Sequence, residues 1–210
     1  MRISTPGARS AVMLCLLVLL AACSKGGERS VDREPRPGSK AAIEKEFSPA
    51  VERLGLRITR AGLARQLGSG DYDPAGRHLA VYVEPVGPVA ADVYVANLVP
   101  VAQAFLPEVF ERFPQLESFD VCQEPPPGVD DRAEPRTWTQ VLTTRQQAST
   151  VDYGRLDLGG LLSAAYLPPS RLVLAVVPEV ATSPLWVRAV SQLSTTRAAT
   201  SSTTVPQPGR

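Results

Sequence analysis

The chain has 210 residues and a formal net charge of +1. Basic and acidic side chains are almost equal in number, 22 against 21, so the protein has no strong electrostatic field, and nucleic acid is excluded as an expected partner. The length leaves room for one domain of ordinary size.

The N-terminus carries an apolar run over residues 11–22, preceded by Arg2 and Arg9 and by no acidic residue. A membrane-spanning helix needs about 20 consecutive apolar residues, so this run is too short to cross a bilayer. A basic start followed by a short apolar core is typical of an export signal. We therefore predict a signal peptide over residues 1–22.

The run ends in Leu20-Ala21-Ala22-Cys23. These residues resemble the lipobox of bacterial lipoproteins, in which the cysteine receives a diacylglyceryl group and the preceding peptide is removed. The resemblance covers about the first 23 residues and implies that Cys23 is lipidated, with acyl chains such as palmitate, and anchors the protein to the extracytoplasmic face of the cell membrane. The alternative is an ordinary secretory signal cleaved near Ala22, which would leave Cys23 as a free thiol.

The region after Cys23 is rich in charge and poor in large apolar residues as far as residue 46. Such a segment cannot bury enough surface to offset the entropy of ordering, so we predict a disordered linker over residues 23–46. The folded domain is then expected over residues 47–193, and the Ser- and Thr-rich residues 194–210 are predicted to form a disordered tail.

Hydrophobic periodicity places the elements of the domain. Alternating apolar residues predict strands, and apolar residues spaced three and four apart predict helices. The first half of the domain is predicted to form a helix over 47–54, strands over 55–66 and 77–85, and a helical stretch over 90–113 that Pro100 and Pro107 kink or split. The second half is predicted to form strands over 116–124 and 136–145, a helix over 156–165, a strand over 171–178 expected at the centre of the sheet, and a helix over 184–193. This mixture predicts an α+β fold with two layers, a mainly antiparallel sheet of about five strands covered by helices.

The residue types for most catalytic chemistry are scarce. His78 is the only histidine, and its place on the polar side of a strand favours a surface or partly buried hydrogen-bonding role over metal ligation. Gly68 to Asp71 forms a turn and not a nucleophile elbow, and no phosphate-binding loop, dinucleotide fingerprint or EF-hand spacing is present. We expect no cofactor and no metal ion.

Cys122 is the only cysteine expected in the mature domain, since Cys15 lies in the signal peptide and Cys23 is the lipidation site. An internal disulfide is therefore not expected. In residues 116–124 the alternation places Cys122 on one face with Asp120 and Glu124, where their charges would raise the pKa of the thiol. The thiol is interpreted as a small buried group under a helix or the C-terminal segment, with an intermolecular disulfide as the alternative.

Glu84, Asp120 and Glu124 are the candidate catalytic residues. On neighbouring strands, two such carboxylates would fall within the spacing of a glycosidase-like acid/base pair. The preferred hypothesis is nevertheless a lipid-anchored domain that binds an unknown protein or small molecule at the cell envelope. The alternatives are an envelope-associated hydrolase that uses these carboxylates, and a ligand carrier with an apolar cavity under the helices.

Overall fold

The structure is a computed structural model that describes residues 36, 38–65, 73–126, 128–129 and 136–201. The chain divides into two units, Met1–Glu34 and Pro35–Arg210, and all of the described residues belong to the second. In this unit a five-stranded sheet packs against helices, which confirms the α+β fold. The predicted signal peptide and Cys23 lie outside the described residues.

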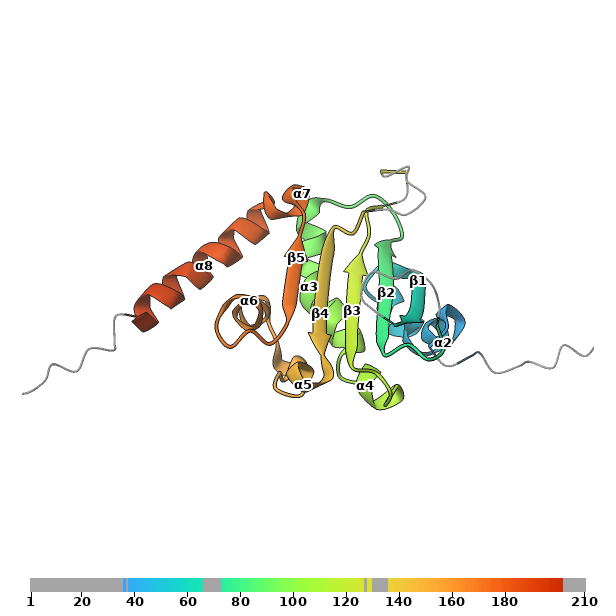
Figure 1. The fold of residues 1–210 in the computed structure, drawn as a ribbon. Helices are drawn as coiled ribbons and strands as arrows, with labels where there is room; N and C mark the ends of the chain where they lie inside the picture. Colours follow the sequence, from blue (N-terminus) through green and yellow to red (C-terminus); the bar gives the residue numbers. More distant parts are fainter. Residues whose placement is uncertain (1–35, 37, 66–72, 127, 130–135, 202–210) are drawn as a thin grey trace, which may run out of the picture. The chain divides into compact units, whose positions relative to one another are not determined.

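The five strands lie side by side in the sheet in the same order as in the sequence (Figure 1). The strands are β1 (Leu56–Ala64), β2 (His78–Pro85), β3 (Ser118–Gln123), β4 (Thr139–Thr144) and β5 (Val173–Val176). Only β2 and β3 pair in parallel, and the other three pairs are antiparallel. A parallel pair needs a long crossover connection, which helix α3 (Ala91–Phe105) provides.

Helix α2 (Lys40–Glu52) extends the fold toward the N-terminus, beyond the predicted boundary at residue 47. Ser39 caps it by accepting a hydrogen bond from the backbone N–H of Ala42. One apolar side chain per turn enters the core, from Ile43, Phe47 and Val51. The prediction of a linker through residue 46 is therefore wrong for residues 40–46. Ile43 is the one large apolar residue in that stretch, and it packs the first turns of a helix whose other core contacts come from Phe47 and Val51.

Helix α3 runs without interruption through Pro100, although the sequence predicted a kink or a break there. The second predicted break is present, because α3 ends at Phe105 and the short helix α4 (Val109–Arg112) follows Pro107. Residues 91–112 are long and apolar enough to span a membrane by composition, but half of that window is buried inside the domain. We therefore interpret α3 as the core helix of the fold.

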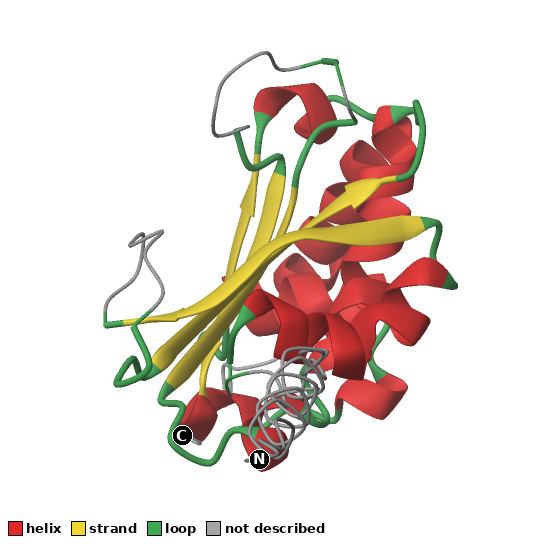
Figure 2. Cartoon of the chain, turned by 90° about the vertical axis from the view of Figure 1, so that its right-hand side faces the viewer, coloured by secondary structure: helices red, strands yellow, loops and turns green. Residues whose placement is uncertain are grey.

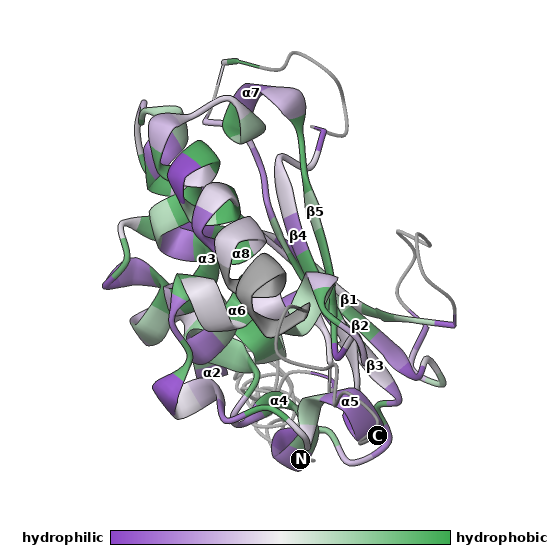
Figure 3. Ribbon diagram, turned by 90° about the vertical axis from the view of Figure 1, so that its left-hand side faces the viewer, coloured by the Kyte–Doolittle hydropathy of each residue, from purple (hydrophilic) through white to green (hydrophobic). Residues whose placement is uncertain are grey.

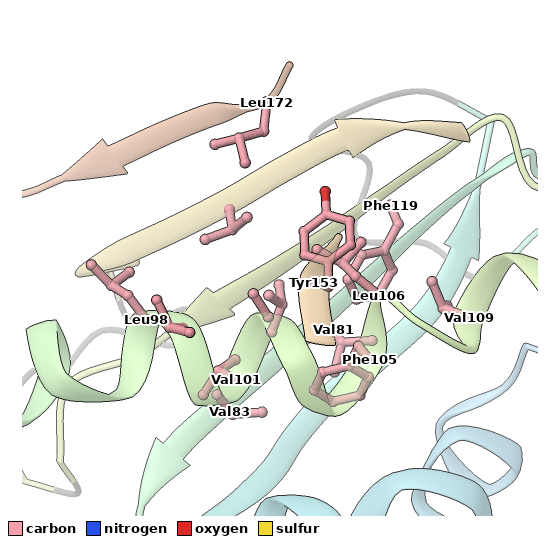
Figure 4. Close-up of a cluster of buried hydrophobic side chains, with 14 of the residues drawn as sticks. Val81, Val83, Leu98, Val101, Phe105, Leu106, Val109, Phe119, Tyr153 and Leu172 are labelled. Carbon is pink, nitrogen blue, oxygen red and sulfur yellow. The ribbon is translucent and has the colours of Figure 1, made fainter. Parts of the chain in front are cut away.

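The main core lies between the helices and one face of the sheet (Figure 2). Side chains of α3 meet those of the strands there, as Figure 4 shows for Leu98, Val101 and Phe105 against Val81 and Phe119. Phe105 stacks obliquely on Phe47 and Phe119, with ring centroids 4.9 and 5.7 Å apart. The alternation that predicted β2 and β3 is thus confirmed, since Val81, Phe119 and their alternate neighbours face the helices.

The C-terminal part adds short elements and one long helix (Figure 3). They are α5 (Arg145–Ala148), a 3-10 turn (Tyr153–Arg155), α6 (Leu158–Tyr166), α7 (Pro178–Ala181) and α8 (Pro184–Ser201). The Asp92 carboxylate accepts a hydrogen bond from the backbone N–H of Leu185 in the first turn of α8, at 3.0 Å. Helix α8 continues to Ser201, so residues 194–201, predicted as a disordered tail, are helical.

Strand β5 lies at the edge of the sheet, not at its centre as the sequence predicted. Its apolar run resembles that of a strand buried on both faces. In the structure Leu174 is buried toward the helices, whereas Val173 is 54% exposed and Ala175 is exposed on the opposite face. The prediction failed because hydrophobicity alone does not distinguish a central strand from an edge strand with a partly uncovered apolar face.

Candidate functional site

The polar side chains of the sheet gather on the face opposite the helices. We call this group the polar face, defined by Arg57, Thr59, Arg60, His78, Tyr82, Glu84, Ser118, Asp120, Cys122, Glu124 and Gln140. In the parallel pair β2–β3, His78 lies beside Ser118 and Tyr82 beside Cys122. The structure therefore places the three candidate carboxylates on one face of the sheet, with Glu84 and Glu124 as neighbours and Asp120 in a separate cluster.

Glu84 and Glu124 are lateral neighbours at the ends of β2 and β3. The backbone N–H of Glu124 donates to the carbonyl of Val83 at 2.8 Å, which extends the parallel pairing past the end of β3. The guanidinium of Arg57, on β1, donates through Nε to Glu84 Oε1 at 2.6 Å. Glu84 also lines a hollow of about 440 Å³ between α2 and β1.

Glu124 is the more buried of the two, with 1% of its side chain exposed. Thr59 Oγ1 donates to Glu124 Oε2 at 2.5 Å, and Arg60 forms a hydrogen-bonded ion pair with Oε1. The Arg60 guanidinium lies 3.9 Å from the centroid of the Tyr82 ring. A register shift between Ile58 and Arg60 adds one residue to β1 at this point, which lets consecutive side chains reach the same carboxylate.

Asp120 belongs to a separate cluster at the middle of the sheet. Gln140 Nε2 donates to Asp120 Oδ2 at 2.6 Å, and His78 Nε2 lies 3.4 Å from Asp120 Oδ1. On its other side, His78 Nδ1 is 3.0 Å from the hydroxyl of Ser118. His78 and Asp120 are each only 3% exposed. The histidine contacts a hydrogen-bonding partner, as the sequence predicted, but the prediction of a surface or partly buried position is wrong, because the side chain is buried.

Cys122 is a free, buried thiol, 2% exposed. Burial raises its pKa strongly and the nearby Asp120 carboxylate raises it further, so the thiol stays protonated near neutral pH. The thiol lies on the polar face, not under a helix as predicted. The same causes act on Tyr82, where burial and then the Cys122 and Asp120 charges raise the pKa of the phenol to about 12.

The arrangement limits the chemistry of the carboxylates. A general acid or base must be free to contact its substrate, yet Glu84 and Glu124 are each held in an ion pair with an arginine. Within the described ranges no group of three or more His, Cys, Asp and Glu side chains could hold a metal ion. The geometry thus favours the two glutamates as ion-pair partners that fasten β1 to β2 and β3.

Sequence reasoning missed several members of the polar face, namely Arg57, Thr59, Arg60, Ser118 and Gln140. Strict alternation would place Arg57 and Arg60 on opposite faces of β1, and the register shift that brings them to one face has no signal in the sequence. Of the aromatic residues outside this face, Trp186 is buried and Tyr166 is 46% exposed.

Comparisons of the chain with known proteins found no relative. The chain matches no protein-family model, no curated protein and no solved structure.

Proposed function

We propose that the chain is a bacterial lipoprotein, anchored through lipid on Cys23 to the extracytoplasmic face of the cell membrane, whose domain binds a partner at the envelope. The support for the anchor is the sequence Leu20-Ala21-Ala22-Cys23 behind a basic start and an apolar run. The described domain begins after this motif, with Ser39 capping α2. This order, signal then cysteine then folded domain, is what a tethered domain needs.

The observation that carries the binding role is the pairing of the two glutamates on the polar face. Glu84 and Glu124 lie close enough in the sheet to be considered as an acid/base pair, but each is already fixed by an arginine of β1. Their pairing disfavours the carboxylate hydrolase of the sequence analysis. A role in binding fits these two glutamates better than catalysis by them.

The anchor is tested by replacing Cys23 and following lipid incorporation. Cells that express the wild-type chain are grown with radiolabelled palmitate, and the label is expected on the membrane-associated protein. Cys23→Ala should lose the label and either accumulate as the uncleaved precursor or appear in the medium. Cys122→Ala is the matched control and should keep both the label and the membrane association.

The binding role is tested against the hydrolase alternative with isolated envelope material. The purified wild-type chain and the double variant Glu84→Gln/Glu124→Gln are incubated with cell-wall and lipid fractions, and the release of soluble products is measured. The proposal predicts no release that depends on these two carboxylates. Product release by the wild type that the double variant loses would establish the hydrolase instead.

A further inference from the structure

We propose that Ser118 is a nucleophile toward small carboxylic esters, with His78 as its base and Asp120 as the group that orients the histidine. This inference goes beyond the proposed binding role, because it assigns a covalent acyl-transfer site to a different part of the polar face. It uses none of the arginine-paired glutamates.

The first support is a continuous line of contacts across β2, β3 and β4. Ser118 Oγ lies 3.0 Å from His78 Nδ1, and His78 Nε2 lies 3.4 Å from Asp120 Oδ1. The three residue types are those of a serine, histidine and aspartate triad, in which roles and geometry identify the group irrespective of sequence order. The two ring nitrogens are exchanged here, because the serine contacts Nδ1 and the aspartate lies at Nε2. Contacts of this kind are commonly long before substrate binds.

The second support is the hydrogen-bonding capacity of the buried atoms. His78 Nε2 and Asp120 Oδ1 are buried, and neither has a hydrogen-bond partner of good geometry in the described part of the chain. They lie 3.4 Å apart, so a proton on Nε2 and a small movement of either side chain would complete a hydrogen bond between them. That tautomer leaves the lone pair of Nδ1 directed at the Ser118 hydroxyl, as a general base requires.

The third support is the way Asp120 is held. Gln140 Nε2 donates to Asp120 Oδ2 at 2.6 Å from the neighbouring strand β4, which fixes the carboxylate with its other oxygen toward the histidine. Gln140 therefore acts as a positioning residue. The Cys122 thiol also lies near Oδ2, at 3.8 Å, but its raised pKa keeps it out of the reaction.

Exposure assigns the nucleophilic role to Ser118. It is partly exposed at the start of β3, whereas His78 and Asp120 are buried behind it. Its chain neighbour Glu117 and its β4 partner Thr144 line an open hollow of about 500 Å³, so Ser118 lies beside this hollow and not in its lining.

The reaction step follows from these positions. Ser118 Oγ attacks the ester carbonyl carbon as its proton moves to His78 Nδ1, and Asp120 stabilises the imidazolium that forms. The bond from the carbonyl carbon to the alcohol oxygen then breaks, and the alcohol leaves with the proton from Nδ1. Water can repeat the sequence on the acyl-serine, which releases the carboxylic acid and restores the hydroxyl.

The test uses the full mature chain in detergent and two probes, 4-nitrophenyl acetate and diisopropyl fluorophosphate. We expect the fluorophosphate to form one phosphoryl adduct per chain, located by peptide mass spectrometry on Ser118, and the ester to release nitrophenolate. Ser118→Ala should lose both signals, whereas the control Ser149→Ala, at an exposed serine after α5, should keep them.

His78→Gln should slow phosphorylation by about a hundredfold or more, because the base is lost. Since this buried variant could unfold, Gln140→Leu is measured beside it and should slow the reaction while Ser118 remains the modified residue. No adduct on Ser118 at excess probe, an adduct on another serine, or an unchanged rate in a folded His78 or Gln140 variant would overturn the inference. Lipidation at Cys23 is read separately and is not affected by any of these results.

Discussion

Arg60 and Glu124 form an ion pair that reaches over a whole strand, from β1 to the end of β3, with Tyr82 of the intervening β2 under the guanidinium. The side chain of Glu124 is 1% exposed and that of Arg60 is 35% exposed. Water can therefore solvate part of the guanidinium, whereas the carboxylate must obtain its hydrogen bonds from protein groups. The pair and the Thr59 hydroxyl satisfy a buried charge that would otherwise be costly.

We predict that Glu124→Gln lowers the free energy of unfolding by about 2 kcal/mol, because a charged group loses hydrogen bonds in a buried site. Urea denaturation measures the change. Glu117→Gln, at an exposed ion pair with Arg77, is the control and should change stability by less than about 1 kcal/mol. In a double-mutant cycle, Arg60→Met should lower the free energy of unfolding by less in the Glu124→Gln background than in the wild type. Purely additive losses of stability would argue against an energetic coupling between Arg60 and Glu124.

The N-terminal boundary of the domain gives the second prediction. Ile43 is fully buried, so Ile43→Ala should lower the free energy of unfolding by about 3 kcal/mol through the cavity it leaves. Glu44→Ala, which removes an exposed pair with Lys40, should cost no more than about 0.5 kcal/mol. A chain that begins at Phe47 should melt at a lower temperature than one that begins at Ser39. Equal melting temperatures would restore the boundary predicted from the sequence.

Cys122 gives the third prediction. Since the thiol is buried and its pKa is raised, Cys122 in the native mature protein should react with a thiol reagent no faster than the domain unfolds locally around it. The same protein in denaturant should react at once, which serves as the positive control. Cys122→Ala should lower stability by about 1 kcal/mol through the loss of a small buried group. Fast labelling under native conditions would place the thiol at the surface and favour the intermolecular disulfide.

Gly76 gives a prediction about the turn before β2. A Cβ added there would lie 2.5 Å from the carbonyl oxygen of Ala64 and 2.7 Å from its backbone nitrogen. Backbone atoms in a strand cannot move aside easily, so Gly76→Ala should destabilise the domain by about 2 kcal/mol. Gly87→Ala is the control, because a Cβ at Gly87 meets no atom within 4 Å. Thermal unfolding of the two variants compares them, and equal stability would contradict the close approach.

The sequence predicted those parts of the fold whose signal is local. Strand β2 and helix α3 follow from periodicity, because each has one face in the core and its apolar residues recur accordingly. Helix α2 was assigned too late in the chain, although Ile43, Phe47 and Val51 are four residues apart. The charged residues before Phe47 dominated the composition and led to the prediction of a linker.

The contacts of the polar face could not be predicted in the same way, because they join residues far apart in the chain. Thr59 and Glu124 are 65 positions apart, and His78 and Ser118 are 40 apart. Their meeting depends on strand order and register, which hydrophobic periodicity does not specify. Alternation did show which residues share a face of β3, and that is how Asp120, Cys122 and Glu124 could be grouped in advance.

The central claim is that the chain is held at the membrane by lipid on Cys23, and mass spectrometry of the N-terminal peptide of the mature protein tests it most directly. The account predicts a peptide that begins at Cys23 and carries the added mass of a diacylglyceryl group, in protein recovered from the membrane fraction. At about 0.8 kcal/mol for each buried methylene, two acyl chains are enough for stable retention. An unmodified N-terminus near Cys23, in protein recovered from the medium, would contradict the account and show an ordinary secreted protein.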